Sequence, residues 1–135
     1  MENEYLILKK KQEKIINNFP QFFAFSDEQL KEGLIKLNVT EKDILSTGFG
    51  GFIKISDKDK YKEMWKVINK QIEKAMENKI YLFKAFVYEM GNHEYCYSQE
   101  DEEVLSAVGI NRKLKEEEKV VYEKARERYF NSVIM

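Results

Sequence analysis

The sequence predicts a single α+β domain in which a small three-stranded antiparallel sheet packs against five or six helices. Long segments with an apolar residue every three or four positions indicate helices, and three short apolar segments indicate strands. The chain has 135 residues, 43% hydrophobic, with only 1 proline, a composition that excludes disorder and a loop-rich β-sandwich. We expect an N-terminal helical arm over residues 1–20 and one globular domain over residues 21–135.

The arm is predicted as a helix over residues 3–18. Leu8, Ile15 and Ile16 are spaced for one face of this helix, and Pro20 ends the segment. Three consecutive lysines lie among these apolar positions, so the apolar face is narrow. Such an arm would pack on the domain or reach a partner.

The three strands are expected at residues 22–25, 44–47 and 52–55. The second and third strands flank the glycine-rich segment Gly48–Gly51, which is the pattern of a β-hairpin. Three strands are about the minimum for a sheet that is stable by itself. The hairpin and the first strand would therefore form one small sheet.

A helix is predicted between the first two strands, from Ser26 to Leu37. Ser26 at the N-cap with Gln29 three positions later forms a capping box, in which each side chain accepts a free backbone N–H. Asn38 is a plausible stop for this helix. Thr40 and Asp43 repeat the capping pattern and predict a short turn.

The second half of the chain is predicted to be helical. Residues 80–91 are apolar on nearly all sides, which favours a helix at the centre of the core over a strand. Further helices are expected over residues 98–109 and 112–133. The clearest amphipathic helix spans residues 58–77. Its apolar stripe, which we expect to be buried, consists of Tyr61, Met64, Trp65, Ile68, Ile72, Ala75 and Met76.

Composition excludes several classes of function. With 23 basic and 24 acidic residues the net charge is −1, so we expect poor binding of bulk DNA. One Cys and one His exclude an internal disulfide and disfavour a zinc site, and no metal or cofactor is expected. No apolar run approaches 18 residues, and we expect no membrane association and a cytoplasmic location.

The segment Asn92–Tyr97 holds the densest set of reactive groups. His93 is the only histidine, and Glu89 lies four positions before it, on the same side of a helix. We favour a structural role, in which His93 caps the end of the helix over residues 80–91, above a binding role, and catalysis comes last. Cys96 is too close to His93 in sequence for an ordinary Cys–His nucleophile pair.

The loop Gly48–Gly51 is a second candidate, because glycines let backbone N–H groups approach a phosphate. A strand follows the loop, however, and the pattern favours the turn of a hairpin. The acidic run of residues 100–103 is read as the solvated start of a helix. The residues that we single out as a candidate binding site are Phe49, Gly50, Gly51, Glu89, Asn92, His93, Glu94 and Tyr95, with no catalytic or metal-binding residue.

Three motifs occur in order: FFAFS at residues 22–26, GGFI at 50–53 and YEMGNHEY at 88–95. With this order and spacing the chain resembles a family of small uncharacterised proteins from phages and mobile elements of Firmicutes and gut bacteria. That family tends to read YEL-x-NHEY, so Met90–Gly91 is a mild departure. The resemblance covers residues 20–110 and implies no reaction. It implies a small accessory protein in the cytoplasm of an infected bacterial cell.

Two functions are compatible with these observations. The first is a phage accessory protein that binds and inhibits a bacterial host defence protein, for example a component of CRISPR–Cas. The chain has 9 Phe, 8 Tyr and 1 Trp, and we expect some of these rings on the surface in Phe22–Phe25, Phe49 or Tyr95–Tyr97. The alternative is a module that binds a small ligand such as a nucleotide signal. An enzyme is disfavoured, and a homodimer is left open.

Overall fold

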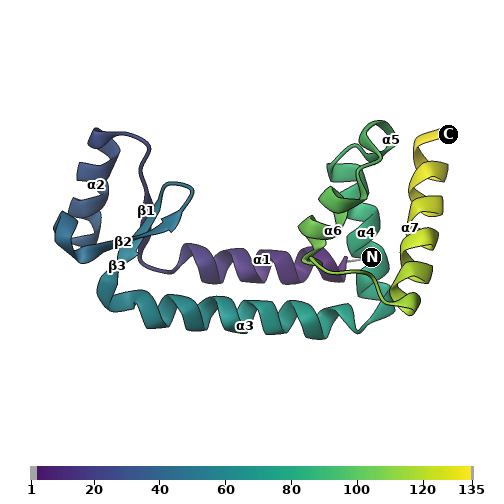
Figure 1. Cartoon of the computed structure of the whole chain (residues 1–135), viewed down its shortest axis with the longest axis horizontal. Coiled ribbons are helices and arrows are strands. Elements are labelled where there is room, and N and C mark those ends of the chain that lie inside the picture. Colours follow the sequence, from purple (N-terminus) through teal and green to yellow (C-terminus); the bar gives the residue numbers. More distant parts are fainter. Residues whose placement is uncertain (1–2, 135) are drawn as a thin grey trace. The chain divides into compact units, whose positions relative to one another are not determined.

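The computed structural model describes residues 3–134 and confirms an α+β fold with a three-stranded antiparallel sheet (Figure 1). The chain divides into two compact units. The sheet unit is Lys11–Asn69, and the helical unit consists of the described residues up to Lys10 together with those from Lys70 onward. Helices α1 (Glu4–Asn17) and α3 (Lys58–Met76) contribute residues to both units. The division into an arm over residues 1–20 and a domain over 21–135 stays a prediction.

The sheet has the order β1-β3-β2, with β1 at Gln21–Phe23, β2 at Ile44–Gly48 and β3 at Gly51–Lys54. Both pairings are antiparallel. Strand β1 ends two residues earlier than predicted. The reason lies in the helix that follows, because the side-chain oxygen of Gln29 accepts the backbone N–H of Phe25 at 2.7 Å, which takes Phe25 out of the strand.

Helix α2 (Asp27–Leu37) begins and ends where the sequence predicted. The Ser26 hydroxyl accepts the N–H of Gln29, and Asn38 ends the helix in the left-handed conformation with φ of 56°. The capping box is incomplete, since Gln29 turns to Phe25 rather than to Ser26. On the sheet, the ring of Phe22 stacks on Phe52 at 5.4 Å between centroids. Thr40 forms the predicted capping box at the short 3-10 helix η1 (Glu41–Asp43).

Helix α3 is a single long helix, and the 3-10 helix η2 (Ile55–Asp57) precedes it. The apolar stripe of α3 is less buried than the sequence predicts. Only Ile68 is fully buried, with 2% of its surface exposed. In the sheet unit Trp65 packs on the edge of Tyr61, and Tyr61 on the edge of Phe19. The apolar stripe of α3 is therefore only partly shielded, and its remaining members are half-buried.

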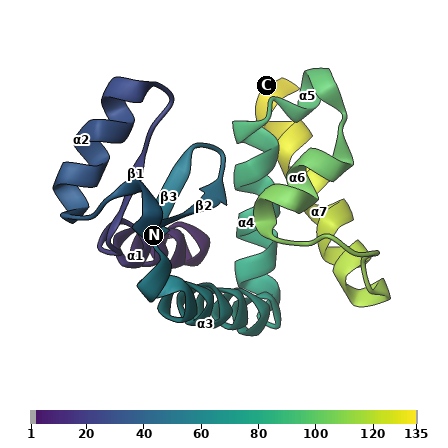
Figure 2. The same ribbon diagram turned by 60° about the vertical axis from the view of Figure 1, so that its left-hand side comes forward.

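The helical unit is built on α4 (Lys79–Asn92), which confirms the choice of a helix over a strand for this segment. Figure 2 shows α4 beside α6 (Asp101–Val108) and α7 (Glu116–Ile134). Phe86 of α4 meets Tyr122 of α7 edge-to-face at 4.9 Å. Most of this helix lies in the core, as expected from its apolar residues, but Ile80 and Tyr88 are exposed to solvent.

The two last predicted helices begin later than expected. A four-residue helix, α5 (Tyr95–Ser98), precedes α6, and the Ser98 hydroxyl accepts the N–H of Glu100 just before α6 starts. Helix α6 ends at Gly109, whose φ of 105° is left-handed. Helix α7 begins at Glu116 because Glu118 accepts the N–H of Lys115 and so caps the helix there. No helix of residues 3–134 is long and apolar enough to cross a membrane.

Candidate functional site

A buried carboxylate is the centre of the predicted Asn92–His93 site. Glu89 lies on the inner side of α4 with 0% of its surface exposed. Its Oε1 accepts a hydrogen bond from the Asn92 amide at 3.1 Å and lies 3.7 Å from Nε2 of His93. Its Oε2 accepts from the hydroxyl of Tyr5 and lies 3.4 Å from Nζ of Lys9. We call these five residues the Glu89 cluster.

Helix periodicity explains how the Glu89 cluster forms. Asn92 and His93 follow Glu89 by three and four positions, so all three side chains share one face of α4. Tyr5 and Lys9 are likewise four positions apart on α1. The sequence therefore predicted the α4 half of the cluster. The α1 half was missed, because no local pattern relates residues 84 positions apart.

Tyr5 is the partner of the buried carboxylate that comes from the first turn of α1. Burial, followed by the hydrogen bond to Glu89, raises the pKa of Tyr5 well above its ordinary value. The phenol therefore stays protonated and donates to Glu89. The ammonium of Lys9 lies 5.7 Å from the Tyr5 ring centroid and 5.9 Å from that of Tyr88, within cation–π range. Every polar member of the cluster thus has a partner, as buried polar groups require.

His93 lies at the C-terminal end of α4, where its backbone N–H donates to the carbonyl of Glu89. One third of its side chain is exposed, and its Nδ1 lies 3.8 Å from the carboxylate of Glu103 on α6. The imidazole is therefore placed between two carboxylates, one buried and one exposed. This position fits the predicted helix-end location. Whether the segment also binds a ligand stays a prediction.

The remaining residues of the segment point in different directions. Tyr95 is buried, and its hydroxyl donates to Asp101 at 2.5 Å, as does that of Tyr122 at 2.6 Å. Burial, then the bond to Asp101, raises the pKa of Tyr95. Glu94 begins α5 in the left-handed conformation. Cys96 is a half-buried free thiol whose backbone N–H donates to the Tyr129 hydroxyl at 3.0 Å.

The glycine-rich loop belongs to the sheet unit and forms the predicted hairpin turn. Phe49 and Gly50 at the centre of the turn have φ of 50° and 80°, and Gly48 has φ of 95°. All three values lie in the left-handed region, where a non-glycine residue such as Phe49 is strained. The loop is thus a turn of the sheet, and its glycines are explained without a bound phosphate.

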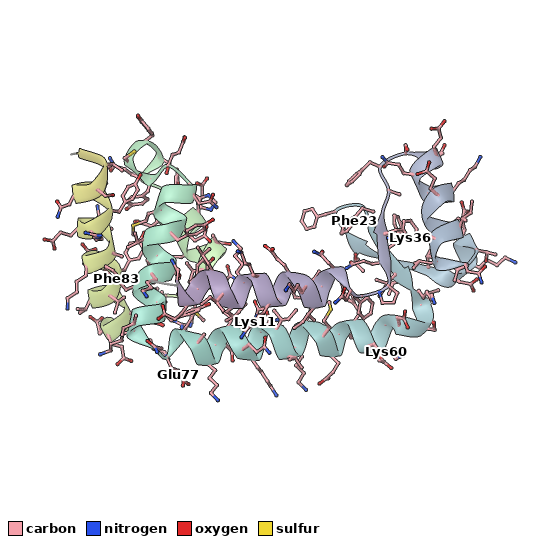
Figure 3. All side chains as sticks on the ribbon, turned by 180° about the vertical axis from the view of Figure 1, so that it is seen from behind. Lys11, Phe23, Lys36, Lys60, Glu77 and Phe83 are labelled. Carbon is pink, nitrogen blue, oxygen red and sulfur yellow. The ribbon has the colours of Figure 1, made fainter. Side chains whose placement is uncertain are left out.

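Two phenylalanine rings occupy the space beside these glycines. A Cβ at Gly50 would lie 2.4 Å from the ring of Phe25, and a Cβ at Gly51 would lie 3.2 Å from the ring of Phe23. The rings nevertheless stay open to water: Phe23 is 58% exposed, Phe25 77% and Phe49 98%. In Figure 3 the labelled Phe23 lies at the end of the sheet. We call Phe23, Phe25 and Phe49 the phenylalanine patch.

The sequence located this patch only in part. It named Phe49 as a candidate residue and expected exposed rings among Phe22–Phe25, Phe49 and Tyr95–Tyr97. Phe22 and Tyr95 are buried, whereas Tyr97 is exposed. Strand alternation is the signal that separates Phe22 from its neighbours, since Phe22 shares a sheet face with Phe52 and Phe23 does not.

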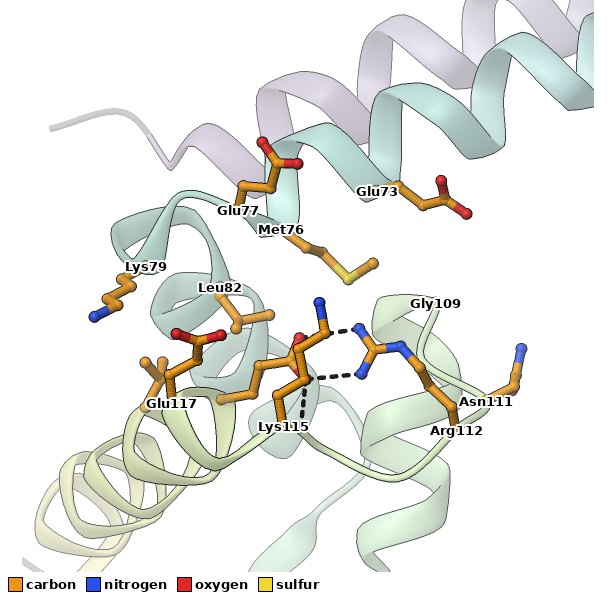
Figure 4. Close-up of a pocket in the computed structure, with 12 residues that line it drawn as sticks. Glu73, Met76, Glu77, Lys79, Leu82, Gly109, Asn111, Arg112, Lys115 and Glu117 are labelled. Atoms are coloured by element: carbon orange, nitrogen blue, oxygen red, sulfur yellow. Dashed lines mark hydrogen bonds and ion pairs between the residues drawn. The ribbon is translucent and has the colours of Figure 1, made fainter.

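The helical unit also contains a pocket of about 660 Å³ that the sequence did not predict (Figure 4). Met76 and Leu82 point into it, and Arg112 forms a two-pronged ion pair with Glu118 at 2.7 and 3.0 Å. This pair holds the pKa of the Glu118 carboxyl below its ordinary value. Glu118 lies in the strongly charged segment of residues 113–119, yet it is buried.

Metal binding has no support in the part of the chain that the structure describes. Within residues 3–134, no group of three or more His, Cys, Asp or Glu side chains is arranged to hold an ion. The acidic run of residues 100–103 lies at the start of α6, as predicted. Its carboxylates complement the helix dipole.

Comparison with known proteins identifies a family. The model described as "Family of unknown function (DUF7659)" matches residues 4–128, and the chain belongs to this family. The match includes α1 and much of α7, which the resemblance over residues 20–110 does not reach. No curated protein and no solved structure matches the chain.

Proposed function

We propose that this member of the family of unknown function DUF7659 acts by binding another protein through its phenylalanine patch. The partner that we propose is a bacterial host defence protein, for example a component of CRISPR–Cas, and the role is that of a phage accessory inhibitor. The observation that carries the proposal is the exposure of three large rings at one end of a small sheet.

Exposed rings of this kind are unfavourable in a protein that acts alone. Removing a large apolar side chain from water is worth about 1.5–3 kcal/mol. Phe25 and Phe49 remain almost fully in water, although the chain has an apolar core in each unit. Aromatic side chains contribute strongly to protein interfaces, where a partner excludes water from them. A protein partner would recover this free energy.

The charges near the patch favour a protein partner over a nucleic acid or a membrane. Residues 21–29 and 44–53, which form the strand ends and turn around the patch, contain no Lys or Arg. Asp27 and Glu28 lie just beyond Phe25 in the first turn of α2. Base stacking and binding to anionic lipid both rely on neighbouring cations. This patch has none in its own segments.

The host-defence role rests on the resemblance to phage and mobile-element proteins. The motif at residues 22–26 contains Phe23 and Phe25 of the patch, and the motif at residues 50–53 contains the glycines beside their rings, since Phe25 lies against Gly50 and Phe23 lies near Gly51. These motif residues share one arrangement, in which exposed rings lie against the glycines of the turn. That arrangement supports a binding role for the motifs.

The test measures both the binding of a partner protein and the effect on plasmid interference by CRISPR–Cas. Wild type, the double variant F25S/F49S and the control I35S are expressed in a Firmicutes host with an active CRISPR–Cas system. Ile35 is a suitable control because it is 79% exposed on α2 of the same unit. We expect wild type and I35S to co-purify one Cas component and to weaken plasmid interference, and F25S/F49S to lose both effects. Equal binding by F25S/F49S would refute the role of the patch.

The alternative function is the binding of a small ligand such as a nucleotide signal, and the pocket of about 660 Å³ favours it by size. Its lining carries both signs of charge: four glutamates, including Glu118, face it together with Lys79, Arg112 and Lys115. Arg112 is already paired with Glu118, which leaves a small acidic excess that does not favour phosphate. Native mass spectrometry of protein purified from infected cells separates the two functions. A bound small molecule without a protein partner would favour the alternative.

A further inference from the structure

We propose that the surface which the phenylalanine patch binds presents arginine side chains. The exposed rings of the patch lie beside two exposed carboxylates, and arginine is the side chain that contacts rings and carboxylates at once. The inference rests on the proposed function, because it names the chemistry of the partner at the patch. It depends on the patch being an interface and not on the identity of the partner.

The carboxylates beside the patch are those of Asp27 and Glu28. Both are exposed in the first turn of α2, and within residues 3–134 neither takes part in an ion pair. The Gln29 side chain, which accepts the N–H of Phe25 at 2.7 Å, ties this turn to the patch. The nearest lysine in sequence, Lys31, lies one turn further along α2. The free charge at the patch is therefore negative and complements a cation.

Arginine fits this combination better than lysine does. Its planar guanidinium group stacks on the face of an aromatic ring and also donates N–H groups to a carboxylate, whereas the lysine ammonium is a compact, strongly hydrated charge. The rings of Phe25 and Phe49 are largely open to such stacking. Both belong to the same turn, because the ring of Phe25 lies against Gly50 and Phe49 precedes that glycine.

The helical unit contains an arginine in such a setting. The guanidinium carbon of Arg126 lies 5.8 Å from the centroid of the Tyr95 ring, and its Nη1 lies 3.4 Å from the carboxylate of Glu123. At the phenylalanine patch the rings and the carboxylates are present, and a partner would supply the cation. A purely apolar partner surface would cover the rings but would leave Asp27 and Glu28 beside it without a counter-charge.

The test is an NMR titration of the isotope-labelled full chain at low salt with the peptide GRGRG and its lysine counterpart GKGKG. We expect the arginine peptide to shift the amide signals of residues 23–28 and 49–51. It should bind about two- to five-fold more tightly than the lysine peptide, the range of an exposed cation–π contact. F25S/F49S should remove this preference. D27N/E28Q should weaken the binding of both peptides by up to about five-fold, as for exposed ion pairs.

The matched control is E102Q/E116Q, which removes one carboxylate each from the first turns of α6 and α7. It should bind both peptides as wild type does. Equal binding of the two peptides, or amide shifts confined to other acidic segments, would overturn the inference. The spectrum of each variant without peptide shows whether it is folded.

The co-purification assay separates this inference from the proposed function. If D27N/E28Q keeps a host partner that F25S/F49S loses, the patch binds through apolar contacts, so the proposed function stands and the arginine inference fails. If wild type prefers the arginine peptide at the patch but no host defence protein co-purifies, the recognition of arginine stands and the proposed role fails.

Discussion

The two units of the molecule differ in the groups that they bury: one buries a charged group, and the other leaves apolar rings exposed. In the helical unit a carboxylate, Glu89, is fully buried and is satisfied by four side chains from two helices. In the sheet unit three phenylalanine rings are left in water around a glycine turn. A buried charge costs much free energy unless it is paired, and an exposed ring gains free energy only when something covers it.

The comparison separates two kinds of candidate site. The members of the Glu89 cluster contact one another, and the carboxylate at its centre is fully buried. The phenylalanine patch is incomplete within the chain, since Phe49 has 98% of its surface in contact with water. We therefore expect substitutions in the cluster to change stability and substitutions in the patch to change binding. The predictions below test that division in order of decreasing effect.

The largest effect is expected for E89A. Removing the carboxylate leaves Tyr5 and Asn92 without their acceptor and opens a cavity in the core, a combination that costs about 3–5 kcal/mol of unfolding free energy. E89Q, which keeps one acceptor oxygen and the volume, should lose less. Urea unfolding at neutral pH measures both. A loss below about 1 kcal/mol for E89A would mean that the cluster contributes little to the fold.

The second effect concerns α3, where sequence and structure disagree. The amphipathic stripe predicts that Trp65 is a core residue, whereas the structure buries Ile68 fully and Trp65 only in part. We expect I68A to cost about 2–4 kcal/mol and W65A about 2 kcal/mol, despite the larger side chain of tryptophan. Denaturant melts of the two variants give the ranking. A greater loss for W65A would show that the stripe is buried as the sequence predicts.

The third effect is a loss of stability at alkaline pH. Burial raises the pKa of Tyr81 from 10.0 to about 12, and burial also raises the pKa of Tyr5 and Tyr122. Between the two values the unfolded chain loses its phenol proton while the folded chain keeps it. The contribution of these phenols to stability should therefore be constant below about pH 9 and fall above pH 10, by about 1.4 kcal/mol per pH unit for each such group.

Y81F isolates one of these groups, because phenylalanine has the same shape without the titrating hydroxyl. Its unfolding free energy should fall less steeply than that of wild type between about pH 10 and pH 12. Y97F is the control, since Tyr97 is exposed on α5 and lies outside the core. Parallel pH profiles for wild type and Y81F would contradict the assignment of the buried phenol.

What the sequence could predict here was local. Ser26 and Asn38 marked the ends of α2, the glycines marked the hairpin, and the spacing of Glu89 and His93 placed them on one face. What it missed depends on distant contacts or on competing bonds. The burial of Glu89 depends on Tyr5 of another helix, and β1 stops early because a glutamine side chain takes the N–H of Phe25.

The exposed phenylalanine rings show a second limit of prediction from the sequence. A run of three phenylalanines and an alanine predicts a buried strand, and composition alone cannot tell which ring faces the core. The face of the strand decides it: the ring of Phe22 lies against Gly33 of α2 and is buried, while Phe23 lies on the other face and is exposed. The candidate residues Gly50 and Gly51 lie beside exposed rings, and their role in binding stays a prediction.

The smallest effect on stability is expected for F25S/F49S. Both rings are mostly in water, so replacing them with serine should change the unfolding free energy by no more than about 0.5 kcal/mol, the usual range for surface substitutions. Phe49 also occupies a left-handed position, where a serine is strained to a similar degree, so the turn gains nothing from the change. Urea melts of wild type and the double variant measure the difference. A loss above about 2 kcal/mol would show that the rings support the sheet itself, and a binding defect of F25S/F49S would then reflect unfolding rather than the loss of an interface.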